Sequence, residues 1–93
     1  MLSLIATLKV KEGQEEEAKG FFRELAKKVT ETEPGTLTYV FHQKRDDPRA
    51  FVVYEKYESD EAFKAHGANL AQHGARFAGV LDGRPELIFL EEI

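Results

Sequence analysis

Residues 51–66, FVVYEKYESDEAFKAH, change from one side-chain pattern to another part-way along. The segment 50–57, which overlaps its start, is rich in β-branched and aromatic residues, and these favour a β-strand. Ser59 is a preferred N-cap residue, and the two acidic residues after it suit the positive end of a helix dipole. The stretch therefore predicts a strand that leads directly into a helix, with His66 inside that helix.

Two more strands are predicted upstream of this stretch. Residues 36–43 show the same enrichment in β-branched and aromatic residues. The polar segment KRDDPR lies between this strand and the next, and it predicts a hairpin with a loop of about six residues. Residues 2–10 alternate between two faces, which predicts another strand. The apolar face of that strand carries Leu2, Leu4, Ala6, Leu8 and Val10.

Two helices and a last strand complete the pattern. Apolar residues recur with helical spacing over 14–32, and the segment EPG stops this helix. The second helix is predicted over 60–81, with a break near Gly74 or Gly79, and 86–93 is the last strand. The order β-α-β-β-α-β predicts an α+β, ferredoxin-like fold. In that fold a four-stranded antiparallel sheet carries both helices on one face.

Length and composition exclude several classes of protein. A chain of 93 residues fits a single domain spanning 1–93, and without cysteine it has no disulfide, thiolate ligand or thiol nucleophile. The net charge of −4, with basic residues scattered along the chain, argues against nucleic-acid binding. No apolar run approaches the ~20 residues of a membrane span, and no basic leader segment is present. These features predict a cytoplasmic domain that binds neither membranes nor nucleic acid.

The predicted sheet carries apolar side chains on both faces, although the helices cover only one. The residues on the uncovered face include Val40, Val52, Tyr54, Ile88 and Leu90. An exposed apolar patch larger than a few hundred Å² is uncommon on a monomer. We therefore expect a homodimer that forms through this sheet face.

His66 and His73 flank the apolar stripe of the second predicted helix, which consists of Phe63, Leu70, Phe77 and Leu81. A histidine at the margin of an aromatic cavity can transfer protons near neutral pH, so His66 is a candidate acid or base. A hydrogen-bonded structural histidine at the edge of the core is the alternative. The two histidines are too far apart for a helical metal pair, and we predict no metal site. The sequence also contains no phosphate-binding, dinucleotide or nucleophile motif.

Three segments of the sequence resemble the antibiotic biosynthesis monooxygenase family: EPGTLTY at 33–39, the stretch 51–66, and LDGRPEL at 81–87. The most specific positions of the resemblance are Glu33, Pro34, Gly35, Tyr39, Glu55, Tyr57, Ser59, Ala62 and His66. The resemblance spans nearly the whole chain and implies a dimeric α+β barrel. The family includes quinol monooxygenases that use neither metal nor flavin.

The resemblance implies a cofactor-independent monooxygenase that oxidises a quinol-like or polyphenolic aromatic with O₂. His66 would be the catalytic base, and Tyr57 would act beside it by orienting the substrate oxygens. The implied substrate-binding residues are Tyr54, Asn69, His73 and Tyr39. Dioxygen reacts slowly with closed-shell molecules, but a deprotonated hydroquinone can give it one electron. The protein would therefore need to supply only a base and a dry aromatic pocket.

Other activities remain open. Haem-degrading relatives use an Asn and a Trp, whereas this chain has no Trp and carries Ala6 and Thr7 on its first strand. Another group of relatives isomerises a small phosphorylated signal metabolite with a histidine and tyrosines. The stretch YEKYESDEAFKAH resembles the pattern of that group. The sequence contains no cluster of basic residues that would bind the phosphate. A dimeric protein that binds an aromatic small molecule without catalysis is the third alternative.

Overall fold

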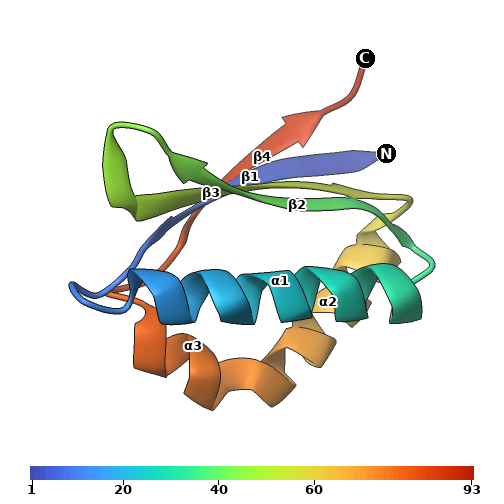
Figure 1. Ribbon diagram of the computed structural model, residues 1–93. Helices are drawn as coiled ribbons and strands as arrows, with labels where there is room; N and C mark the ends of the chain where they lie inside the picture. Colours follow the sequence, from blue (N-terminus) through green and yellow to red (C-terminus); the bar gives the residue numbers. More distant parts are fainter.

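Four antiparallel strands form one sheet, and all the helices lie on one of its faces (Figure 1). The computed structural model describes residues 1–93 without gaps. The elements in chain order are β1 Leu2–Lys9, α1 Glu15–Thr32, β2 Thr36–Lys44, β3 Asp47–Tyr57, α2 Asp60–Leu70, a 3-10 turn Ala71–His73, α3 Gly74–Val80 and β4 Glu86–Glu91. The predicted ferredoxin-like βαββαβ fold is confirmed.

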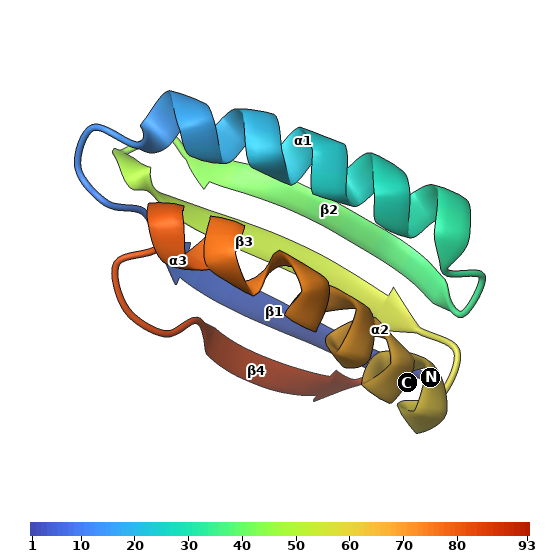
Figure 2. The same cartoon turned by 90° about the horizontal axis from the view of Figure 1, so that it is seen from below.

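The strand order in the sheet is β2-β3-β1-β4, so β1 and β3 are central. Cross-strand partners share a face of an antiparallel sheet. The pairs Leu4↔Glu55 and Ala6↔Val53 lie on the helix-covered face, whereas Ile5↔Tyr54 lies on the opposite one. Seen from the helix side, α1 runs along β2, the two parts of the second helix run over β3 and β1, and β4 lies beyond them (Figure 2).

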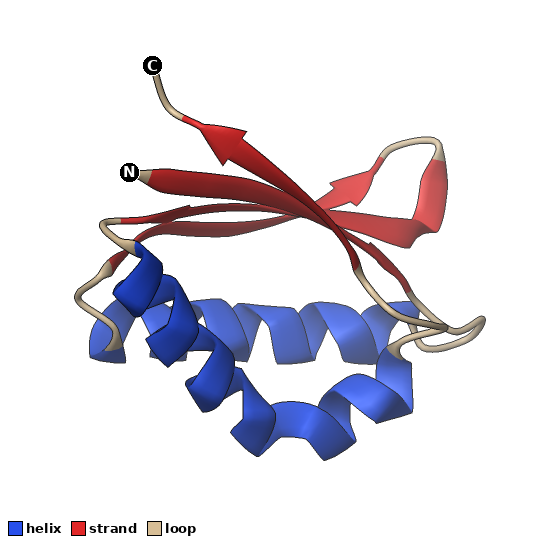
Figure 3. Ribbon diagram, turned by 180° about the vertical axis from the view of Figure 1, so that it is seen from behind, coloured by secondary structure: helices blue, strands red, loops and turns tan.

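The core lies between the two layers that Figure 3 shows from behind. Helix α1 packs one apolar stripe onto the sheet, which is the arrangement its spacing predicts. The buried residues of this stripe are Ala18, Phe21, Phe22, Leu25 and Val29. Phe22 contacts two sheet aromatics, with ring centroids 4.5 Å from Phe41 and 5.2 Å from Phe51. This cluster fixes α1 on the β2–β3 half of the sheet.

The hairpin between β2 and β3 is tighter than its sequence predicts. Residues 45–46 alone separate the two strands, so the predicted loop of about six residues is wrong and Pro48 lies inside β3. Pairing with the end of β1 extends the strand: the amide of Val10 donates to the carbonyl of Arg49 over 2.7 Å. An ion pair of 2.6 Å between Lys9 and Asp47 supports the same end. These long-range contacts outweigh the local turn preference.

The second helix is broken where its glycines indicated. The 3-10 turn separates α2 from α3 just before Gly74, and the helical segment ends at Val80 instead of Leu81. Leu81 forms an isolated bridge with Val10, which ties this end of the helical segment to β1. No helix of the protein is both long and apolar enough to span a membrane.

Candidate functional site

A cavity of about 530 Å³ opens between the helix-covered face of the sheet and the second helix. This volume lies within the range of small-molecule sites. Its wall is mostly hydrophobic, and only a few of its residues carry polar side chains: Tyr39, Glu55, His66 and Arg84. Arg84 is the one lysine or arginine on this wall, and it makes no ion pair.

His66 is the only buried residue of α2, and just 2% of it is exposed. The sequence placed it on the flank of the helix, but the apolar residues around it, such as Phe63 and Leu70, are only half-buried. The reason is a polar partner in the core. The Nδ1 atom of His66 lies 2.8 Å from Oε1 of Glu33, within hydrogen-bond distance. A buried imidazole with such an acceptor is held in one orientation.

Glu33 occupies the end of α1, where the helix meets the EPG turn. Its amide donates to the carbonyl of Val29 over 2.9 Å. Its carboxylate oxygen Oε1 also accepts a hydrogen bond of 2.8 Å from the hydroxyl of Thr36. These contacts fix the carboxylate that faces His66, even though the two residues are 33 positions apart in the chain.

Gly35 explains how the EPG turn comes so close to α2. A Cβ atom at this position would lie 2.7 Å from the Cβ of Ala62, closer than real Cβ atoms approach other atoms. The carbonyl of Gly35 also accepts a hydrogen bond of 3.0 Å from the amide of Glu58. The absent side chain lets the turn lie against the first turn of α2. The Glu33 carboxylate thereby reaches the imidazole.

The other imidazole nitrogen, Nε2 of His66, is buried and has no hydrogen-bond partner. Its nearest charged neighbour is Oε1 of Glu55, at 3.9 Å. Glu55 reaches this position because it alternates with Val53 and Tyr57 on the inner face of β3. The hydroxyl of Tyr57 donates a hydrogen bond of 2.5 Å to Oε1 of Glu55. His66 therefore lies between two carboxyl groups, hydrogen-bonded to one and not to the other.

The burial of this cluster changes its protonation. Desolvation raises the pKa of Glu55, although the hydrogen bond from Tyr57 and the nearby His66 oppose that effect. Burial also raises the pKa of Tyr57 and of Tyr39, and the neighbouring carboxyl groups raise both further. The two phenols therefore stay protonated. The site contains one imidazole, two carboxyl groups and two neutral phenols.

The structure brings His66, Tyr39 and Tyr57 together, but with different access to the cavity. Tyr39 lines the wall, and its ring centroid lies 4.7 Å from that of His66 in an edge-on arrangement. Tyr57 has no exposed surface and lies outside the cavity wall, with its ring centroid 5.3 Å from that of His66. Tyr57 thus contacts Glu55 and His66 without bordering the cavity.

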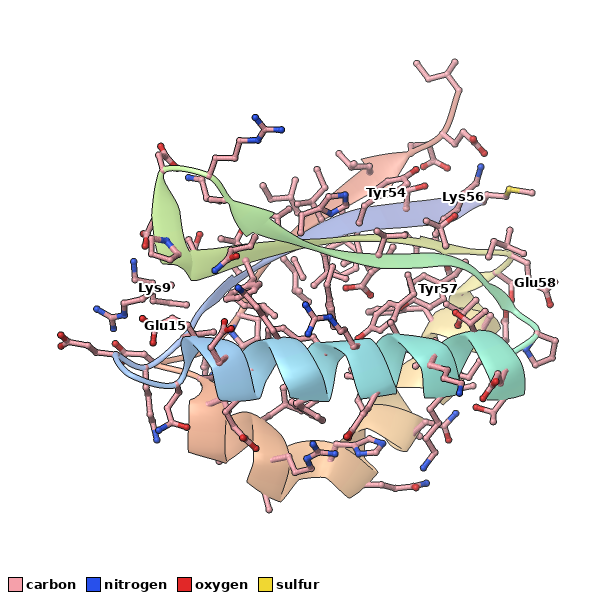
Figure 4. All side chains as sticks on the ribbon, in the orientation of Figure 1. Lys9, Glu15, Tyr54, Lys56, Tyr57 and Glu58 are labelled. Atoms are coloured by element: carbon pink, nitrogen blue, oxygen red, sulfur yellow. The ribbon has the colours of Figure 1, made fainter.

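The other three predicted site residues lie elsewhere. Tyr54 is on the sheet face away from the helices, whereas Tyr57 points toward them (Figure 4). Asn69 and His73 border a separate hollow of about 20 Å³ beside α1, which is too small for an aromatic ring. Asn69 also borders a hollow of about 340 Å³ beside the EPG turn, which does not include His66. Their predicted contact with a substrate has no support in this geometry.

Sequence reasoning assigned no role to Glu33 or Glu55, although both belong to the motif that it quoted. The signal for Glu55 was available: an acidic residue on the inward-facing side of an apolar strand is uncommon and needs a partner. No pattern in the sequence placed Glu33 beside His66. Nowhere are three or more His, Cys, Asp or Glu side chains arranged to hold a metal ion.

Comparison with known families decides the assignment. The sequence model of the family described as antibiotic biosynthesis monooxygenase matches residues 1–76. The chain belongs to this family. The family resemblance predicted from the sequence is therefore confirmed. A comparison with curated proteins gives no match.

Solved structures of relatives share the fold over almost their whole length. A provisionally assigned antibiotic biosynthesis monooxygenase from Caulobacter crescentus CB15 is 31% identical, with a TM-score of 0.91 over 99% of this chain and 89% of its own. PA3566 from Pseudomonas aeruginosa is 26% identical, with a TM-score of 0.87 over 99% of this chain and 93% of its own. A similarly assigned protein from Nitrosomonas europaea is 24% identical, with a TM-score of 0.90 over 100% and 99% of the two chains, and it shows the fold alone.

Proposed function

We propose that this family member is a cofactor-independent monooxygenase that oxidises a quinol-like or polyphenolic aromatic with O₂. The observation that supports it best is the asymmetric environment of His66. One nitrogen is hydrogen-bonded to Glu33, while Nε2 has no partner beside a largely apolar cavity. In a neutral imidazole whose Nδ1–H is donated to a carboxylate, Nε2 carries no proton, and that is the form a general base requires.

The chemistry balances without an external reductant. His66 Nε2 takes the proton of one quinol hydroxyl: the O–H bond breaks, an N–H bond forms, and the electron pair stays on the substrate oxygen. The quinolate then reduces O₂. One oxygen atom enters the ring to give a hydroxyquinone and the other leaves as water, so the quinol supplies all four electrons. The apolar wall excludes water from the anion during these steps.

The test is O₂ uptake with menadiol and a panel of related quinols. Replacing His66→Asn removes the base, and we expect uptake to fall by about 10²–10⁴-fold, as for other lost general bases. His42→Asn is the matched control, because His42 lies outside the cavity wall; since it is on the helix-free face of the sheet, the control is valid when this variant sediments like the parent. Uptake that is equal in His66→Asn and the parent would refute the proposed base.

Assays under argon separate the other candidate functions. Turnover of a phosphorylated candidate metabolite without O₂ would indicate an isomerase, and saturable binding of a quinol without any turnover would indicate a binding protein. For an isomerase acting on a phosphorylated metabolite, the cavity offers a phosphate only one strongly basic side chain, Arg84. One basic side chain is a weak site for a phosphate, and this favours the monooxygenase over the isomerase.

We also propose a homodimer that forms through the helix-free face of the sheet. Several apolar residues are exposed there: Val40 at 46%, Tyr54 at 38%, Ile88 at 55% and Leu90 at 39%. They are contributed by three of the four strands, β2, β3 and β4. A second copy is the occupant that matches such a face with its own in a two-fold arrangement. The cytoplasmic location expected from the sequence stays a prediction.

Sedimentation velocity at micromolar concentration tests this dimer. The parent should sediment as two subunits, and Val40→Lys/Ile88→Lys should dissociate it because both substitutions place charge in the apolar face. Lys28→Glu, on the exposed side of α1, is the control for a change of surface charge. A parent that sediments as one folded subunit would contradict the dimer.

A further inference from the structure

Glu55 has no role in the base mechanism, yet it is a carboxyl group buried on the wall of an apolar cavity. Tyr57 holds one of its oxygens, Oε1, through a hydrogen bond of 2.5 Å. No protein group hydrogen-bonds the other oxygen, Oε2. Nε2 of His66, itself without a partner, lies 3.9 Å from Oε1 of this carboxyl group. The buried imidazole nitrogen without a partner and a buried carboxyl group thus lie side by side at one place on the wall.

We infer that Glu55, in its neutral form, donates a hydrogen bond to the same substrate oxygen that His66 deprotonates. This inference rests on the proposed function. His66 Nε2 removes the proton, and the Glu55 hydroxyl stabilises the negative charge left on the oxygen. Tyr57 is a positioning residue, because it contacts Glu55 and has no surface on the cavity.

A substrate oxygen can lie between His66 Nε2 and the Glu55 carboxyl group if these two side chains move slightly apart. An oxygen atom hydrogen-bonded to both, at about 2.8 Å from each and with a tetrahedral angle, requires about 4.6 Å between the two protein atoms. Nε2 is now 3.9 Å from Oε1 of Glu55, the oxygen that accepts the Tyr57 hydrogen bond and that, when it carries the acid proton, can still donate to the substrate. A side-chain displacement of about 0.7 Å therefore admits the substrate oxygen.

The surroundings of Glu55 favour its neutral form. Desolvation raises its pKa, and this is the largest effect on the group. The titratable groups around it are Tyr57 on its own strand, Tyr39 on β2, and His66 on α2 with Glu33 behind it. Both phenols are neutral, and the hydrogen bond from Tyr57 and the nearby His66 oppose the effect of desolvation on the pKa of Glu55 without reversing it. A buried carboxylic acid kept neutral can donate a hydrogen bond to an anion, as one does in ketosteroid isomerase.

This arrangement defines the reacting group of the substrate. The oxygen must lose a proton to His66 and must then accept a hydrogen bond from Glu55, while the rest of the molecule fits an apolar wall. A phenol or hydroquinone oxygen meets these requirements. An ether has no proton to lose, and an aliphatic alcohol is too weak an acid for imidazole to ionise.

The experiment measures how 4-nitrophenol binds, because its ionised form is yellow and can be followed directly. In the parent, we expect the bound probe to ionise at a pH at least one unit below that of the free probe. Glu55→Gln should keep that shift, since an amide can donate the same hydrogen bond. Glu55→Leu should abolish it and weaken binding of the phenolate at least tenfold. Glu55→Leu/Tyr57→Phe guards against misfolding, because it leaves no tyrosine hydroxyl buried without a partner.

O₂ uptake with menadiol gives the second readout. Glu55→Gln should retain at least a third of the parent rate, and Glu55→Leu should lose at least tenfold. If Glu55→Gln falls as far as Glu55→Leu, or if Glu55→Leu binds phenolate as tightly as the parent, the inference is overturned. If phenolate binding depends on Glu55 but no quinol consumes O₂, the role of Glu55 is supported and the monooxygenase fails.

Discussion

The hydrogen bond between Glu33 and His66 can be tested through folding alone, without knowing the substrate. Glu33→Leu removes the acceptor of His66 Nδ1 and of the Thr36 hydroxyl. The imidazole is buried, so its donor finds no water, whereas Thr36 is half-buried and recovers part of its loss. A buried donor left unsatisfied costs about 1–3 kcal/mol, and a charged acceptor raises the value of the bond to about 1.5–3 kcal/mol.

We therefore expect Glu33→Leu to lower the free energy of unfolding by about 2–3 kcal/mol. Glu33→Gln keeps an amide oxygen as acceptor and loses only the charge, so it should cost about 1 kcal/mol. A domain of this length has about 5–14 kcal/mol in total, and both variants should stay folded. The control is Glu31→Gln, because Glu31 is exposed and makes no side-chain hydrogen bond. It should change stability by less than about 0.5 kcal/mol.

The assay is urea unfolding followed by circular dichroism, at one fixed protein concentration because a dimer makes stability depend on concentration. With a slope of about 1.5 kcal/mol per molar urea, the unfolding midpoint of Glu33→Leu should lie about 1.3–2 M below that of the parent. If Glu33→Leu and Glu31→Gln unfold at the same midpoint, the hydrogen bond contributes nothing. The orientation of His66 would then need another explanation.

Three further predictions concern the same cluster. The raised pKa of Glu55 means that the folded state binds its proton more tightly than the unfolded state does. The free energy of unfolding should therefore fall as pH rises through that pKa. Unfolding curves measured between pH 4 and 9 should show this decline in the parent and not in Glu55→Gln. In Tyr54→Phe, only Tyr39 and Tyr57 remain, and their raised pKa values should keep both phenols protonated until alkali unfolds the chain. The ultraviolet absorbance of tyrosinate reports this ionisation, and an increase in that absorbance before unfolding would contradict the burial of the two phenols. Gly35→Ala should lower the free energy of unfolding by about 1–3 kcal/mol, because the new Cβ would clash with the start of α2. If its thermal unfolding temperature is no lower than that of the parent, the turn moves to accommodate the methyl group.

The fold follows from local patterns, and most of it could be predicted. The two-residue period of β1 and the helical spacing of α1 depend only on neighbours in the chain, so both elements lie within one or two residues of their predicted ends. The predicted loop length of the β2–β3 hairpin was wrong because it depends on contacts between distant parts of the chain. Its strands are extended by pairing between Val10 and Arg49, and no short segment contains that information.

Some residues of the site could likewise be predicted from the sequence, and others could not. His66 could be found because a histidine beside a helical apolar stripe stands out, and Tyr39 because it belongs to the quoted motif. Glu33 could not be assigned, since its approach to His66 depends on the close packing at Gly35. Tyr54 is one residue before Glu55, and the alternation of a strand places the two on opposite faces. A motif thus identifies the residues of a site without saying which of them point into it.

The strand order has a consequence for how the chain is made. Strand β1 lies in the middle of the sheet, and both of its partners, β3 and β4, are synthesised after it. Until β4 emerges, one edge of β1 offers unpaired backbone groups to any passing strand. The nascent chain therefore exposes an unpaired strand edge until β4 has been synthesised. The cavity wall that Leu87 of β4 completes is also the last part to form.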